Sequence, residues 1–130
     1  EKGKGAWRNG ERISVSSVAA CENALVSTGF PYEIARRVDE ILERMRPVLS
    51  SCQGVRRCGA AALDLAWTAC GRFDAFYEDE LKPWDMAAGA LLVTEAGGSI
   101  SNLDGSPFDL RWSILAGNKA MHELIGKMIR

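Results

Sequence analysis

The sequence has no long apolar run and no excess of charge of either sign. Its longest apolar stretch, residues 86–93, is interrupted by Gly89 and is far shorter than the roughly 18–20 residues of a membrane span. Sixteen Lys and Arg stand against seventeen Asp and Glu, so the formal net charge is −1. A protein that binds nucleic acid mainly by neutralising phosphates is expected to be basic. We therefore expect a soluble protein that binds neither membranes nor nucleic acid.

The sequence also lacks the residues of several common catalytic sites. Its one histidine, His122, makes a Ser-His-Asp or Cys-His arrangement within the chain improbable. It contains no phosphate-binding loop of the type G-x-x-x-x-G-K-[ST]. The four cysteines, Cys21, Cys52, Cys58 and Cys70, form no C-x-x-C pair, and a chain with this much apolar material needs no disulfides. We therefore expect buried free thiols and a reducing, cytoplasmic location.

The composition is that of a folded domain. The chain has 130 residues, of which 47% are hydrophobic and 25% charged, so we expect one domain spanning residues 1–130. Residues 1–5 are charged and glycine-rich and are followed by no apolar segment, so they do not indicate a secretion signal. We expect these five residues to be flexible.

Alternation of the hydrophobic period between two and 3.6 residues indicates alternating strands and helices. Asn9-Gly10 predicts a type I′ hairpin turn, because both turn residues need a positive φ. Strands are predicted at residues 6–8, 12–15, 24–28, 54–57, 73–78, 99–103 and 113–117, and helices from Pro31 to Pro47, at 60–70 and 85–96, and from Asn118 onward. We expect the helix at 60–70 to be buried on nearly all sides. One sheet with helices on its faces would hide both apolar sets, so the predicted fold class is α/β.

An acidic cluster is the first candidate functional site. Glu78, Asp79 and Glu80 end a predicted strand shortly before Asp85, and carboxylates in such a position could hold a hard divalent cation. Asp85 also has a structural interpretation, because aspartate is a favoured N-cap residue. The two roles are compatible, since one carboxylate oxygen can cap the helix while the other faces a metal.

A small-residue segment is the second candidate. Gly59, Ala60 and Ala61 precede or begin a helix, and their small side chains leave backbone N–H groups open to an anion or a sugar hydroxyl. They could equally serve close packing of helix on sheet. Arg56 and Arg57 could bind an anionic substrate or a partner, or could simply be solvated. Asp64 lies within the apolar helix, where we expect an arginine to pair with it.

Two segments resemble a known signature. Leu81–Gly89 (LKPWDMAAG), followed by Glu95–Gly98 (EAGG), resembles the second signature of the inositol monophosphatase family. Residues 59–64 and 71–78 are similar to the adjoining segments of that family at matching spacing, and residues 7–10 and 13–16 resemble the hairpin that begins its C-terminal half. The segment 28–31 fits the bacterial and plant members. The resemblance covers essentially the whole chain, and the combination of W-D-x-A-A-G with E-A-G-G is highly specific.

The resemblance implies a layered αβα domain with a mixed sheet, and a homodimer. It implies hydrolysis of a phosphate monoester such as inositol 1-phosphate with Mg²⁺, and inhibition by lithium. Asp85 would be a metal ligand and Glu78 would bind inositol hydroxyls, while Gly59–Ala61 would line the substrate pocket with Arg56 nearby. Relatives that act on fructose bisphosphate, NADP, histidinol phosphate or phosphoadenosine phosphate share the signature, so the substrate stays open.

The first signature of the family, D-P-[IL]-D-G-T, is absent from this chain, as is the upstream glutamate pair. These residues supply most of the metal ligands. The chain therefore looks like the C-terminal half of such an enzyme, and its missing partner would be the N-terminal half. We expect the chain alone to bind Mg²⁺ poorly, because a single carboxylate cannot replace the six oxygens that Mg²⁺ prefers, and to hydrolyse nothing. The alternative is a non-catalytic binding or assembly module.

Overall fold

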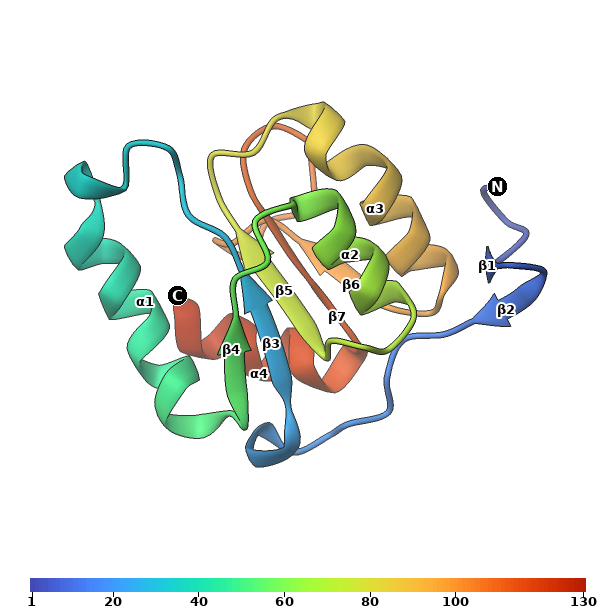
Figure 1. Cartoon of the computed structure of the whole chain (residues 1–130), viewed down its shortest axis with the longest axis horizontal. Helices are drawn as coiled ribbons and strands as arrows, with labels where there is room; N and C mark the ends of the chain where they lie inside the picture. Colours follow the sequence, from blue (N-terminus) through green and yellow to red (C-terminus); the bar gives the residue numbers. More distant parts are fainter.

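The fold is built on a mixed five-stranded sheet with the strand order β4-β3-β5-β7-β6 (Figure 1). In this computed structural model, which describes all 130 residues, β3 pairs in parallel with β4 and β5. β7 pairs antiparallel with β5 and β6. The strands are β3 (Leu25–Thr28), β4 (Gly54–Arg56), β5 (Ala75–Glu78), β6 (Ser99–Ser101) and β7 (Ile114–Gly117). The carboxyl ends of β4, β3 and β5 therefore lie at one edge of the sheet.

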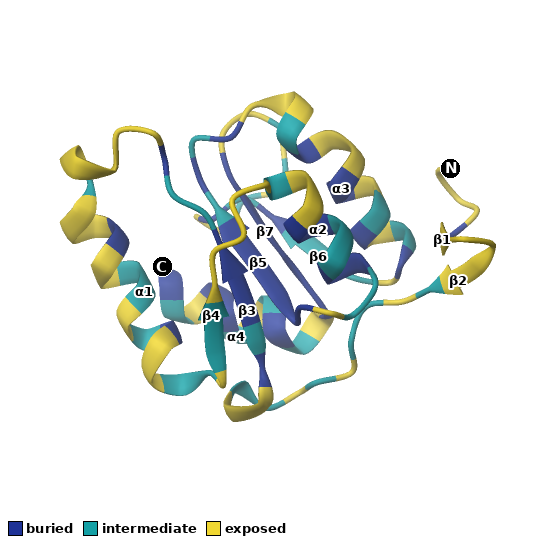
Figure 2. Cartoon of the chain, viewed as in Figure 1, coloured by how far each residue is buried: buried dark blue, intermediate teal, exposed yellow.

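Helices cover both faces of this sheet. The helices α2 (Ala61–Ala69) and α3 (Pro83–Glu95) pack on one face, and α1 (Val38–Ser51) and α4 (Lys119–Ile129) on the other (Figure 1). Successive residues of β5 alternate between the two faces: Phe76 packs in the α2–α3 core and Tyr77 in the α1–α4 core. The central strands β3, β5 and β7 are mostly buried, while the outer sides of the helices are exposed (Figure 2). The predicted α/β class and the layered arrangement are confirmed.

A hairpin stands apart from the main sheet. β1 (Ala6–Arg8) and β2 (Glu11–Ile13) form a separate antiparallel pair, and the turn residues Asn9 and Gly10 have φ of 52° and 82°. The hairpin prediction is confirmed. The chain before it is tied to α3, because the backbone N–H groups of Gly3 and Gly5 donate to the Glu95 carboxylate at 2.6 and 2.8 Å. This contact would restrain residues 1–5, which we expected to be flexible.

The helix predicted from Pro31 to Pro47 is wrong at both ends. Residues 34–36 form only a 3₁₀ turn, and α1 begins at Val38 and continues through Pro47 to Ser51. An internal proline removes a helix hydrogen bond and costs roughly 3 kcal/mol. The residue after it, Val48, is completely buried against the sheet, and this burial helps to offset the cost. Tertiary packing thus overrides the local signal.

Other predictions held in part. Asn118 caps α4 as expected, because its Oδ1 accepts the Met121 N–H at 2.9 Å. The helix at 60–70 is present as α2 but is not buried on nearly all sides, since Leu63 is 50% exposed. The four cysteines are free, but none is buried and Cys58 is exposed. None of the four α-helices has the length and apolar content of a membrane span.

Candidate functional site

A cavity of about 700 Å³ opens at the edge of the sheet where β4, β3 and β5 end. Five of the six substrate and metal residues that the resemblance implied line it: Gly59, Ala60, Ala61, Glu78 and Asp85. Their segments are far apart along the chain and meet because parallel strands end at one edge, where α/β proteins commonly bind ligands. Further lining residues are Gly29, Phe30, Pro31, Tyr32, Ile34, Arg57, Asp79, Glu80, Leu81, Lys82, Trp84 and Trp112.

One wall of the cavity is the entry to α2. Gly59 has a φ of +86°, a conformation that residues with a Cβ rarely adopt, and Ala60 is the N-cap residue of the helix. No side chain caps this end. The first N–H groups of a helix have no partner within it, so small side chains here leave room for a hydroxyl or an anion to approach.

Glu78 ends β5 and forms the floor of the cavity. Its carboxylate packs directly over Gly29, where a Cβ would collide with it. Burial, together with the nearby Asp64 carboxyl, raises the pKa of Glu78 to about 7, against the lowering effect of the Arg57 guanidinium. A carboxyl group with this pKa exchanges its proton near neutrality, so it can either donate a hydrogen bond to a hydroxyl or accept one.

The raised pKa of Glu78 predicts how stability depends on pH. Glu78 binds its proton more tightly in the folded chain, with a pKa of about 7, than at its ordinary value of 4.5, so folding loses stability as the pH rises from 4.5 to 7. Glu78→Gln removes this loss. Because a difference of one pKa unit is worth ~1.4 kcal/mol, we expect the variant to gain ~3 kcal/mol relative to wild type between pH 4.5 and 8. Urea unfolding of both proteins across this range tests it, and a constant difference would contradict it.

Asp64 is buried beside the floor of the cavity and departs from expectation. It is 1% exposed, and neither carboxylate oxygen makes a hydrogen bond. No arginine pairs with it, so the expected arginine partner is wrong. Burial raises the pKa of this carboxyl, as an unpaired charge in the interior is costly. Asp64 therefore binds its proton more tightly than an exposed aspartate does.

Asp85 lies in the first turn of α3, and the prediction that it is the N-cap residue is wrong, because Lys82 occupies that position. The helix begins two residues earlier, because Pro83 suits the first helical position, where no N–H donor is needed. The cap role survives in another form: Asp85 Oδ2 accepts the backbone N–H of Lys82 at 2.8 Å. The other oxygen, Oδ1, makes no hydrogen bond and remains for a ligand in the cavity.

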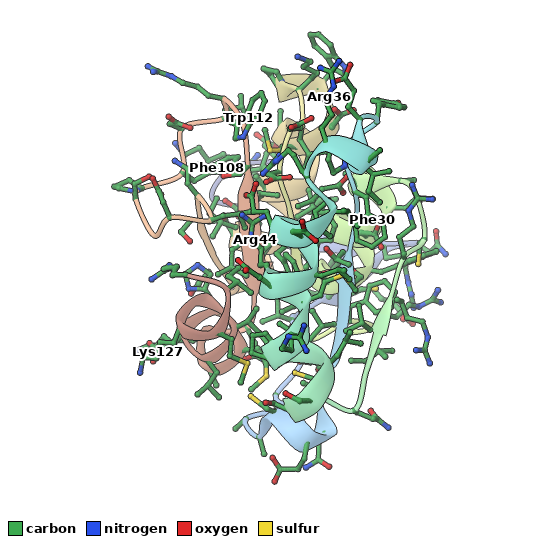
Figure 3. The ribbon with its side chains drawn as sticks, turned by 90° about the vertical axis from the view of Figure 1, so that its left-hand side faces the viewer. Phe30, Arg36, Arg44, Phe108, Trp112 and Lys127 are labelled. Carbon is green, nitrogen blue, oxygen red and sulfur yellow. The ribbon has the colours of Figure 1, made fainter.

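Asp79 and Glu80 are occupied by arginines from α1 and the turn before it. Arg37 contacts Asp79 Oδ2 at 2.7 Å and Glu80 Oε1 at 2.6 Å, and Arg44 contacts Asp79 Oδ2 at 3.0 Å. Arg44 projects from α1 in Figure 3. These ion pairs hold the segment after Glu78 and neutralise its charge. The expected cation seat of Glu78, Asp79 and Glu80 is therefore wrong, and no group of three metal-ligating side chains gathers in the chain.

The two adjacent arginines separate at the end of β4. Arg56 Nη1 donates to the carbonyl of its neighbour Val55 at 3.1 Å, and Arg56 does not line the cavity. Arg57 does line it and stacks over the Phe30 ring, 5.9 Å from the ring centroid. The sequence offered no means to choose between them, because the direction of each side chain depends on where the strand ends. Phe30, labelled in Figure 3, and Trp112 are further cavity residues that the sequence reasoning missed.

Comparisons with known proteins agree with this architecture. The model of the inositol monophosphatase family matches residues 1–130. The inositol-1-monophosphatase of Caulobacter vibrioides is 43% identical over 133 residues, covering all of this chain and 52% of the relative. A relative named Nus factor SuhB, from Pseudomonas aeruginosa, is 48% identical over 120 residues, covering 90% of this chain and 44% of the relative.

Solved structures show the same arrangement of elements. The extragenic suppressor protein suhB of Bartonella henselae superposes with a TM-score of 0.95 at 39% identity, covering 100% of this chain and 51% of that one. The inositol monophosphatase of Anabaena gives a TM-score of 0.91 at 38% identity and covers 97% of this chain and 50% of that one. This chain therefore spans about half the length of the relatives that it matches.

Proposed function

Because the chain belongs to the inositol monophosphatase family, we propose that it forms the substrate-binding half of a Mg²⁺-dependent phosphatase. The complete enzyme would hydrolyse a small polyol phosphate, with inositol 1-phosphate as the first candidate, to the polyol and phosphate. The chain alone would be inactive. Members of the family are in general Mg²⁺-dependent, and the relative from Caulobacter vibrioides is named for inositol 1-phosphate hydrolysis.

The observation that carries this proposal is the joint presence of Glu78 and Asp85 in one cavity. Glu78 has a pKa of about 7 and suits a hydroxyl group of a polyol, because it can donate or accept a hydrogen bond. The start of α2, which no side chain caps, forms another wall of the cavity and would orient the ring. Asp85 keeps one carboxylate oxygen without a hydrogen bond, at the end where the phosphate ester would lie.

The donor set of this chain fits only part of a metal site. Asp85 offers one oxygen ligand, and no group of three metal-ligating side chains accompanies it. Bound Mg²⁺ would polarise the phosphoryl group and lower the pKa of an attacking water. The remaining ligands would have to come from the other half of the enzyme. Within this chain, the residues bind and orient the substrate.

A chimera tests the proposal. The part of the Caulobacter vibrioides inositol-1-monophosphatase that precedes the matched region would be joined in front of Glu1, since all of this chain aligns with that relative. We expect the chimera to release phosphate from inositol 1-phosphate only with Mg²⁺, and less so with lithium, while the 130-residue chain alone releases none. A folded chimera that hydrolyses no sugar or polyol phosphate would overturn the proposal.

The second candidate is an assembly module. The name of the Pseudomonas aeruginosa relative, a Nus factor, favours this possibility. It predicts that the chimera binds a protein partner yet shows no phosphatase activity. The expected homodimer of the complete protein also stays a prediction, and the sedimentation of the chimera would test it.

A further inference from the structure

Arg57 is a cavity guanidinium that no carboxylate neutralises. It lines the cavity, yet it takes part in none of the ion pairs of the chain. Arg37 and Arg44, by contrast, are both occupied by Asp79. The charge of Arg57 lowers the pKa of two carboxyl groups, Glu78 and Asp64, without forming an ion pair with either. Arg57 therefore keeps its hydrogen-bond donors for a ligand.

The guanidinium of Arg57 is also held in place. It lies over the Phe30 ring, in a cation–π contact. It also lies beside Gly59: a Cβ at that glycine would stand 3.3 Å from Arg57 Nη1. The missing side chain at position 59 thus leaves Arg57 next to the open backbone at the start of α2. A planar donor beside free N–H groups is an arrangement that suits an oxyanion.

The strand order places Arg57 and Asp85 at opposite ends of the cavity. Arg57 follows the edge strand β4, and Glu78 ends β5, with β3 between them. Neighbouring strands lie ~4.8 Å apart, so these two positions are separated by roughly 10 Å. Asp85 lies in the first turn of α3, which packs over β6 and β7 on the far side of β5. A polyol bound at Glu78 would thus have Asp85 on one side and Arg57 on the other.

We propose that Arg57 determines substrate specificity by binding a second anionic group, at the end of the cavity away from the hydrolysed phosphate. The favoured substrates are then polyol phosphates that carry a further phosphate. This assignment of the substrate rests on the proposed function, whereas the anion site itself rests on the geometry of Arg57, Phe30 and Gly59.

Titration of the 130-residue chain with inorganic phosphate tests the anion site without any activity. We expect saturable shifts of the Gly59 and Ala60 amide signals in nuclear magnetic resonance spectra. Arg57→Gln should weaken this binding about tenfold or more, because a charge-assisted hydrogen bond is lost. Arg56→Gln is the matched control, since its side chain lies outside the cavity, and should change the affinity less than about twofold.

Both side chains are exposed, so both variants should keep the wild-type spectrum elsewhere. Absence of saturable shifts in wild type, or equal affinities of the two variants, would overturn the anion site. Arg57→Lys adds a further check: it keeps the charge and should retain more of the affinity than Arg57→Gln.

The chimera tests the choice of substrate. We expect Arg57→Gln to lower kcat/KM for inositol 1,4-bisphosphate about tenfold and to leave kcat/KM for inositol 1-phosphate within about twofold. An unchanged ratio of the two values would overturn the role of Arg57 in specificity. If the chimera hydrolyses neither ester, the proposed function fails, and the phosphate titration still decides whether Arg57 binds anions.

Discussion

Asp85→Asn is expected to reduce phosphate release by the chimera at least about a hundredfold. The substitution removes one charged ligand from the position where the metal is proposed to bind, and metal stabilisation of the transition state is worth several kcal/mol. Because each ~1.4 kcal/mol corresponds to a tenfold change in rate, the loss should reach about two orders of magnitude. Initial rates of phosphate release at saturating Mg²⁺ measure it.

The same variant separates the two roles of Asp85. An asparagine keeps a side-chain oxygen that can accept the Lys82 N–H, as Asp85 Oδ2 does at 2.8 Å, so the start of α3 should survive. We expect the free energy of unfolding to change by less than ~1 kcal/mol. Glu78→Gln is the matched comparison and should act mainly on KM, because Glu78 is assigned to the substrate. Unchanged turnover in Asp85→Asn would leave Asp85 as a helix cap only.

Gly89→Ala is expected to destabilise the chain by ~2 kcal/mol or more, since overpacking of a tight core typically costs 1–3 kcal/mol. Gly89 is buried in α3 where it meets α2, and a Cβ would collide with the Cβ and Cδ1 of Leu65. Leu65 is completely buried and has no room to yield. The two helices would have to move apart, and this would also displace the part of the cavity wall that their first turns form. Urea unfolding of the variant and the wild type measures the loss.

Gly126→Ala is the matched control, as it places the same substitution in another buried helical position. There a Cβ would approach the flexible end of Arg130, at 2.9 Å from Nη2, and Cδ2 of Leu115 at 3.2 Å. Alanine favours a helix over glycine by up to ~1 kcal/mol, which should offset these contacts. We therefore expect a nearly neutral effect. Equal destabilisation by the two substitutions would contradict the tight α2–α3 contact.

The features that could be predicted are those set by neighbouring residues. Asn9-Gly10 encodes its turn locally through two positive φ angles, and Asn118 encodes the start of α4 through its own side chain. The family resemblance added Glu78, Asp85 and the small residues of the cavity wall. Each of these lies at the end of a strand or the start of a helix, where the pattern of the sequence changes.

The features that could not be predicted depend on contacts between distant segments. Val48 keeps α1 intact past Pro47 only because the sheet is there to bury it. Arg37 neutralises Asp79 across 42 positions of sequence, so the cluster of acids seemed free until the fold was known. Asp64 similarly gave no sign that it would lie unpaired in the interior.

The tie between Glu95 and the residues before the hairpin bears on the order in which the chain assembles. Its two hydrogen bonds join groups 90 and 92 positions apart, so they close very long loops. Closing such long loops lowers the entropy of the chain before the contacts stabilise the fold. The two hydrogen bonds therefore become favourable only after α3 has folded. Within residues 3–95, the segment that is synthesised earliest is therefore the last to be fixed in the fold. Gly3 and Gly5 leave the ribosome well before Glu95, and folding secures them only after α3 has formed.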